Sequence, residues 1–158
     1  MTSLVKSGMQ LLRRTPLRTF VLYPLIVLAW EFFLNSGGLR LQPFFLLLML
    51  WGYLQYRLCG LYRIKRGGGG PGLETPPERL VTAGPYAYSR NPMYLGHIIF
   101  LTGLSLTLTS LFAALITLVA AIWFHFRALR DEQRLVQLVG APYIDYTARV
   151  KRWLPGLF

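Results

Sequence analysis

Cysteine and acidic residues are both scarce in this chain of 158 residues. Cys59 is the single cysteine, which excludes an intrachain disulfide framework and a thiolate metal site. The two histidines have no clustered third ligand, so we expect no metal. Only six acids stand against 17 lysines and arginines, which gives a formal net charge of +11.

Charged residues of both signs make up 15% of the chain, whereas 54% of it is hydrophobic. This composition is outside the range of soluble domains and predicts an integral membrane protein. The basic residues lie between long apolar blocks and do not form one basic domain. We therefore expect anionic lipid headgroups as their partners, and no nucleic acid.

Four apolar blocks are each close to the length that a helix needs to cross a bilayer. Because open backbone groups cannot be satisfied in lipid, these blocks predict an all-α integral membrane protein with four transmembrane helices. Residues 108–110 leave room only for a tight turn, so we expect the third and fourth helices to form a hairpin. The blocks are Leu17 to Leu34, Leu41 to Leu61, Pro92 to Leu108 and Leu111 to Phe126.

The basic residues also predict the orientation. Of the 17 lysines and arginines, only Arg40 lies in the loop after the first block. By the positive-inside rule, both termini and the connection from residue 61 to 91 face the cytoplasm, in the inner membrane of a cell. Residues 1–15 have apolar side chains at helical spacing and predict an interfacial helix on that side. An organellar transit peptide is the alternative, since no acid precedes Glu31.

The chain is predicted to form one domain, residues 1–158, in three parts. Residues 1–61 hold the interfacial helix and the first two membrane helices, and residues 80–158 form the core that binds a ligand. Residues 62–79 are a cytoplasmic linker. The run RGGGGPG at residues 66–72 lacks the Gly-Lys-Ser/Thr ending of a phosphate loop and is typical of a flexible linker.

Glu31 is an acid inside the first apolar block, which is by default a functional hypothesis. Four helices with one acid in the first are also typical of small proton-coupled multidrug exporters. Glu31 lies near the outer end of its helix, however, where water and headgroups can reach it. We keep the exporter as the alternative function from another class.

Residues 80–96 place an arginine, a prolyl helix start and three tyrosines at the mouth of the third block. Across the hairpin, Arg90 comes level with the fourth helix just before Asp131 and Glu132, if that helix continues. Arg127 and Asp131 share a face. Both charge signs beside aromatic faces fit S-adenosylmethionine, a sulfonium zwitterion, although other zwitterions would fit as well.

His97 lies about one helical turn inside the third block. An intramembrane histidine can be functional, and we place it among the candidate cofactor-binding residues. A hydrogen-bonded packing role is the alternative.

Two linked motifs carry a resemblance to a known family. LVTAGPYAYSRNPMYLG at residues 80–96 is followed across one hairpin by RALRDEQRLVQLVGAPYIDYTARVKRWLP at residues 127–155. This pattern resembles the isoprenylcysteine carboxyl methyltransferase family and its phospholipid methyltransferase relatives, over residues 78–155. The resemblance implies methyl transfer from S-adenosylmethionine to a lipophilic or amphipathic substrate at the cytoplasmic face. Carboxyl methylation of an isoprenylcysteine-like substrate is favoured, and N- or S-methylation of a phospholipid or small molecule is the alternative.

The resemblance also implies roles for individual residues. Arg127 would hold a carboxylate substrate, and Glu132 is the candidate base if the nucleophile is an amine or thiol. Two positions depart from the family pattern: Asn91 replaces its usual His, and Asp131 replaces the first Glu of its acidic pair. A C-terminal helical cap would close over the cofactor. The implied cofactor-binding residues are Leu80, Val81, Tyr86, Arg90, Asn91, Pro92, Met93, Tyr94, Asp131, Glu132, Tyr143 and Tyr146.

Overall fold

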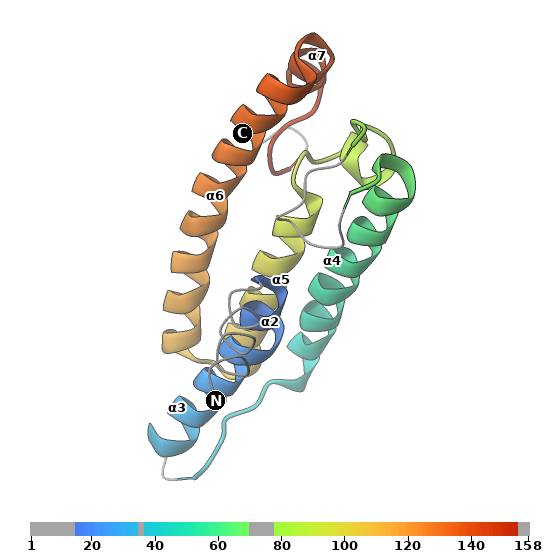
Figure 1. The fold of residues 1–158 in the computed structure, drawn as a ribbon. Helices are drawn as coiled ribbons and strands as arrows, with labels where there is room; N and C mark the ends of the chain where they lie inside the picture. The colour runs from blue at the N-terminus through green and yellow to red at the C-terminus, as the bar shows by residue number, and fades with distance from the viewer. Residues whose placement is uncertain (1–14, 35–36, 70–77, 155–158) are drawn as a thin grey trace, which may run out of the picture.

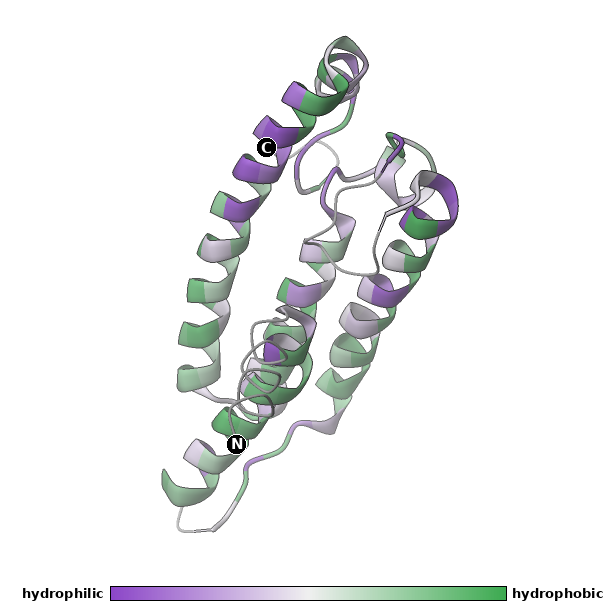
Figure 2. Ribbon diagram, viewed as in Figure 1, coloured by the Kyte–Doolittle hydropathy of each residue, from purple (hydrophilic) through white to green (hydrophobic). Residues whose placement is uncertain are grey.

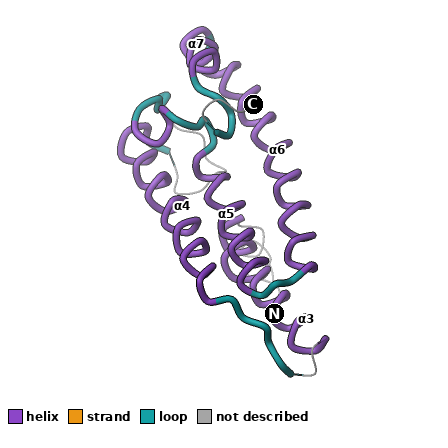
Figure 3. Tube along the Cα trace, turned by 180° about the vertical axis from the view of Figure 1, so that it is seen from behind, coloured by secondary structure: helices purple, strands orange, loops and turns teal. Residues whose placement is uncertain are grey.

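The computed structural model describes residues 15–34, 37–69 and 78–154. These residues form a bundle of helices joined by loops (Figures 1 and 3), which confirms the all-α prediction. The predicted interfacial helix up to residue 14 lies outside the described residues, as does the part of the predicted glycine linker from residue 70 onward.

The first membrane helix is a continuous run of 20 residues, Thr15–Leu34. It consists of α2 (Thr15–Leu17), the π-helical segment η1 (Arg18–Leu22) and α3 (Tyr23–Leu34). A short 3₁₀ turn, η2 (Pro43–Phe45), then leads into α4 (Leu46–Gly67).

The predicted end of the second helix at Leu61 is wrong, because α4 continues to Gly67. Lys65 and Arg66 lie in its last turn, where cations interact favourably with the helix dipole. Gly68 then adopts a φ of 71°, a conformation that favours glycine and ends the helix.

The second half of the chain begins with a 3₁₀ turn, η3 (Gly84–Ala87), and two long helices. Helix α5 (Pro92–Thr107) starts at a proline, whose fixed φ suits the first helical turn. Helix α6 (Leu111–Val139) continues well past the apolar block that ends at Phe126, and α7 (Ala141–Arg149) follows it. The connection from α5 to α6 is three residues long, 108–110.

Within the part of the chain that the structure describes, three helices are long and apolar enough to cross a membrane: Thr15–Leu34, Pro43–Gly67 and Leu111–Val139. Helix α5 is shorter, with 16 residues, and lies between α4 and α6 (Figure 1). Most hydrophilic residues gather at the end of the bundle that carries α7 (Figure 2). The chain is therefore a membrane protein, whereas four spans and a cytoplasmic C-terminus stay predictions.

Helices α4 and α5 touch through glycines. A Cβ on Gly52 would lie 2.5 Å from the backbone nitrogen of Phe100, and one on Gly96 would lie 2.8 Å from the carbonyl oxygen of Gly52. Gly103 makes a similar approach, 2.7 Å from the backbone nitrogen of Met49. Small residues allow such backbone contact between membrane helices. We call this row of contacts the glycine seam.

Glu31 joins the first membrane helix to the start of α6. Ser110 caps α6 by accepting a hydrogen bond from the Ala113 N–H at 3.0 Å, and its hydroxyl donates to Glu31 Oε1 at 2.5 Å. The carboxylate thus supports a helix cap, which is a structural role.

The glycine seam predicts opposite effects for two substitutions of the same kind. Gly96→Ala should lower stability by about 1–3 kcal/mol, because its methyl group meets backbone that cannot move aside. Gly60→Ala should be neutral or stabilising, because the nearest atom is the flexible end of Met93 at 3.2 Å. Thermal unfolding of both variants in detergent checks this, and equal midpoints would contradict the seam.

Candidate functional site

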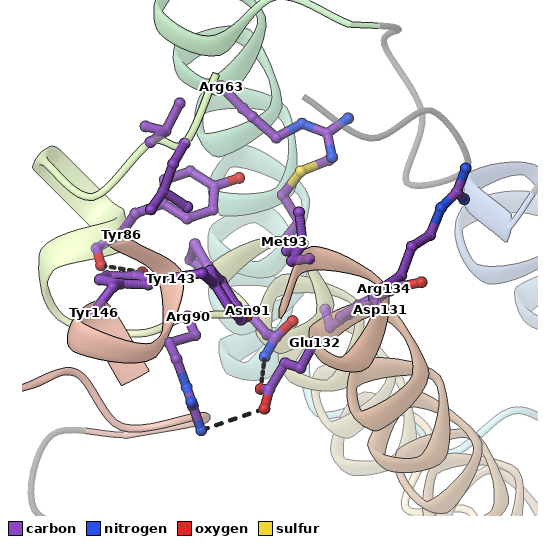
Figure 4. Close-up of a pocket in the computed structure, with 15 residues that line it drawn as sticks. Arg63, Tyr86, Arg90, Asn91, Met93, Asp131, Glu132, Arg134, Tyr143 and Tyr146 are labelled. Atoms are coloured by element: carbon purple, nitrogen blue, oxygen red, sulfur yellow. Dashed lines mark hydrogen bonds and ion pairs between the residues drawn. The ribbon is translucent and has the colours of Figure 1, made fainter. Parts of the chain in front are cut away.

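A cavity of about 100 Å³ lies at the polar end of the bundle (Figure 4). Its walls come from the end of α4, the segment before α5, the first turn of α5, the charged part of α6, and α7. The side chains around it carry both charge signs and four tyrosine rings. The lining residues are Arg63, Leu80, Val81, Tyr86, Arg90, Asn91, Pro92, Met93, Tyr94, Asp131, Glu132, Arg134, Leu135, Tyr143 and Tyr146.

Glu132 is the centre of the ionic network beside this cavity. The residue is 9% exposed. Its carboxylate accepts two hydrogen bonds of 3.0 Å from the guanidinium of Arg152. Arg90 Nη2 lies 3.4 Å from Oε2, and the amide of Asn91 donates to Oε1 at 3.2 Å. The hydrogen bonds from Arg152 to Glu132 raise the pKa of the Arg152 guanidinium. Both carboxylate oxygens are therefore engaged by cations or N–H donors.

Hydrogen bonds to backbone carbonyls hold the segment before α5 against the C-terminal residues. The backbone N–H of Arg90 donates to the carbonyl of Lys151 at 3.0 Å, and the Ser89 hydroxyl donates to the carbonyl of Arg152 at 3.2 Å. On the other side of the cavity, the Tyr146 hydroxyl donates to the carbonyl of Tyr86 at 2.6 Å. The wall is thus tied to α7 and to the tail that follows it.

A second polar chain runs along the side of the cavity next to α6. The Tyr94 hydroxyl donates to Asp131 Oδ2 and accepts a hydrogen bond from Arg127 Nε at 3.0 Å. Arg127 Nε also lies 3.9 Å from the same carboxylate oxygen. Arg127 therefore reaches the cavity wall through Tyr94, although it is not itself a lining residue.

Three tyrosines around the cavity are neutral at physiological pH. Burial, helped by the charge of Glu132, raises the pKa of Tyr143 to about 12. Burial also raises the pKa of Tyr86 and of Tyr146. Neutral phenol rings present an electron-rich face without a full charge, which suits contact with a cation.

The structure brings twelve of the predicted site residues around one cavity. All of the positions that the resemblance assigns to the cofactor line it, including Asn91 and Asp131, which depart from the family pattern. Asn91 bonds to Glu132 and to the carbonyl of Arg152 at 3.4 Å, so its amide binds protein groups on both sides.

His97 does not reach the cavity. Its ring is fully buried and stacks between Phe20, with centroids 4.8 Å apart, and Phe124, at 5.1 Å. Tyr56 closes a third side at 4.7 Å. Within the described residues neither ring nitrogen has a hydrogen-bond partner, so the hydrogen-bonded alternative is not seen either. Residue 97 lies on the same face of α5 as Met93 and Tyr94 but one helical turn farther from the cavity, so its ring is in the aromatic core.

Four functional residues were missed by sequence reasoning. Arg63, from the end of α4, is 8% exposed and lines the cavity, as do Arg134 and Leu135 of α6. Arg152, in the C-terminal tail, donates two hydrogen bonds to Glu132. The only sequence signal for Arg63 is its position at the polar end of an apolar helix, and Arg152 has none, because its role depends on how the tail returns in space.

The arrangement can bind a ligand that carries both charge signs and an aromatic or cationic part. Small-molecule sites usually measure about 300–1,000 Å³. A ligand of nucleoside size would therefore extend out of this 100 Å³ cavity or displace side chains around it. Arg90 Nε, which is buried and has no partner among the described residues, is a donor that such a ligand could use.

Comparisons with known proteins find similarity to methyltransferases. Residues 69–139 match a family model described as phospholipid methyltransferase. Two proteins named protein-S-isoprenylcysteine O-methyltransferase, from Mus musculus and Rattus norvegicus, are 32% identical to this chain over 78 residues. That alignment covers 48% of this chain and 27% of each relative.

Removing the carboxylate of Glu132 should destabilise the protein strongly. Glu132→Ala leaves two guanidiniums without their buried counter-charge, and losing one partner of a buried pair typically costs about 3–5 kcal/mol. Arg149→Ala, on exposed surface of α7, should change stability by less than about 0.5 kcal/mol. Thermal unfolding in detergent compares the two variants, and similar midpoints would show that the network adds little.

Proposed function

We propose, from the premise that this chain belongs to the family of phospholipid and isoprenylcysteine methyltransferases, that it transfers a methyl group from S-adenosylmethionine to a lipophilic or amphipathic acceptor. The observation that carries this proposal is the gathering of Arg90, Asp131 and the buried tyrosines around one cavity. When bound, the cofactor supplies a methyl group on a sulfonium, whose sulfur keeps the bonding electron pair and becomes a neutral thioether.

The lining residues fit the charges of this cofactor. Arg90 would bind the carboxylate, since its Nε has no other partner among the described residues. Asp131, whose side chain is 37% exposed, would bind the ammonium group. The neutral rings of Tyr86, Tyr94 and Tyr143 would surround the sulfonium. Met93, buried at the start of α5, would contribute to an apolar wall.

A carboxylate acceptor agrees best with the network. Both oxygens of Glu132 are engaged by Arg90, Asn91 and Arg152, so this residue positions the cavity walls and is poorly placed to take a proton. A carboxylate is already ionised at neutral pH and needs no base. Arg127 would orient it beside Tyr94, and alignment in a site that excludes water would be the main source of rate enhancement.

We also propose that the site faces the cytoplasm. The cavity lies at the hydrophilic end of the bundle, which the positive-inside rule assigns to that side (Figure 2). A cofactor would then arrive from water and the acceptor from the bilayer.

The exporter alternative has no support. The comparisons find methyltransferases, and Glu31 accepts a hydrogen bond from the residue that caps α6. An amine or thiol acceptor remains the second candidate within the methyltransferase function, because the phospholipid methyltransferase match does not select the nucleophile.

Arg90→Ala should weaken the binding of S-adenosylmethionine, because a charge-assisted hydrogen bond contributes about 1.5–3 kcal/mol, or roughly 10- to 100-fold in affinity. Arg79→Ala, an exposed arginine just before the cavity segment, is the matched control and should leave affinity unchanged. Isothermal calorimetry on the purified protein measures both. If the unaltered protein binds no cofactor, the methyltransferase proposal fails.

The nucleophile can be identified from the product. We expect the protein to transfer labelled methyl groups to a total membrane extract, and mild alkali to release the label as methanol, because esters hydrolyse and N-methyl groups and thioethers do not. Arg127→Ala should reduce incorporation about tenfold or more and lower cofactor affinity much less, since Arg127 contacts Tyr94 and Asp131 but does not line the cavity. Label that resists alkali would favour the amine or thiol acceptor.

A further inference from the structure

A second and larger cavity lies between the first membrane helix and α6. Its volume is about 420 Å³, within the range of about 300–1,000 Å³ that ligand sites usually have. Helix α6 contributes apolar side chains to it from Phe112 to Trp123 and Phe124, a path of about 16 Å along the helix axis up to Trp123. The opposite wall includes the polar residues Thr15, Arg18 and Thr19. We call this cavity the α6 groove.

The polar wall of the α6 groove contains donors that have no acceptor. Thr15 is 3% exposed, and its hydroxyl has no hydrogen-bond partner within the described part of the chain. The same is true of the buried Nε of Arg18. Buried polar groups in proteins are almost always hydrogen-bonded, and leaving one unpaired costs about 1–3 kcal/mol. These two side chains line the same cavity and suit a ligand with acceptor oxygens.

The charge beside this wall is positive and poorly balanced. The guanidinium of Arg18 lies 5.2 Å from the centre of the Trp123 ring, and that of Arg127 lies 5.3 Å from the same ring. Arg127 has Asp131 at 3.9 Å, but no carboxylate pairs with Arg18 among the residues that the structure describes. Two cations around one indole repel each other, and an anion bound near Arg18 would offset this repulsion.

The α6 groove adjoins the cavity assigned to the cofactor. Phe124 lines the groove, and its ring packs 5.2 Å from that of Tyr94, which lines the other cavity. Arg127 lies at the same boundary, because it donates to the Tyr94 hydroxyl and contacts Trp123. Arg18 belongs to the π-helical segment η1, a geometry that is frequent at functional sites.

We infer that the α6 groove binds the methyl acceptor, an amphiphile whose anionic head lies at Arg18 and whose apolar chain runs along α6 toward Phe112. Arg18 then determines specificity, because it favours acceptors with a carboxylate head over those with an amine head. The inference rests on the proposed function for its link to methyl transfer. It adds a site on the first membrane helix, which lies outside residues 69–139 that match the family model.

The test uses a fatty acid with bromine on its chain, because bromine quenches the fluorescence of a tryptophan in contact with it. The protein is held in lipid nanodiscs, and an alkyl ammonium of the same brominated chain is the comparison probe. We expect the carboxylate probe to quench Trp123 with at least tenfold higher affinity than the ammonium probe. Trp123→Phe identifies the fraction of the signal that comes from this residue.

Three substitutions separate charge from structure. Arg18→Gln should abolish the preference for the carboxylate probe, and Arg18→Lys should restore most of it, because the positive charge returns. Arg130→Gln removes a charge from an exposed position of α6 and should change nothing. Ile116→Phe narrows the groove without altering charge or adding a tryptophan and should weaken the binding of both probes, which keeps the test valid if Arg18→Gln fails to fold.

Failure of this inference can be told from failure of the proposed function. If cofactor binding and methyl transfer occur, but Arg18→Gln binds both probes as the unaltered protein does, the assignment of the acceptor head to Arg18 is overturned. Equal quenching by the two probes in the unaltered protein would overturn it as well. If the carboxylate preference depends on Arg18 and no cofactor binds, the groove is an anionic amphiphile site and the methyltransferase proposal fails.

Discussion

The carboxylate of Glu132 joins three segments that are distant in the sequence. It receives Arg90 and Asn91 from the start of α5 and Arg152 from the tail, while its own backbone belongs to α6. One carboxylate can contact both guanidiniums only if all three segments keep their positions. This corner of the cavity therefore depends on a single side chain.

Helix α6 has an apolar part and a polar part. Its 29 residues extend about 43 Å, well beyond the roughly 30 Å of hydrocarbon in a bilayer. Asp131 and Glu132 lie on the polar part, and Trp123 lies in the apolar part beside the α6 groove. Because one rigid helix carries all three, a shift at either cavity moves side chains of the other.

The elements and most of the cavity could be predicted because their signals are local. Apolar length, the proline at position 92 and the three-residue connection before α6 define where α5 begins and ends and where α6 begins. Arg63 and Arg152 could not be predicted, since each acts where separate segments meet. His97 was assigned to the cofactor by a general rule about intramembrane histidines, and the packing of Phe20 against α5 placed it in an aromatic core.

The glycine seam limits where a lipid-borne molecule can enter the protein. Where the backbones of α4 and α5 touch at Gly52 and Gly96, no gap remains that is wide enough for a hydrocarbon chain. A lipid-borne molecule therefore cannot enter between these helices. The α6 groove lies on the opposite side of α5, between the first membrane helix and α6, and is the route that this closed contact leaves to such a molecule.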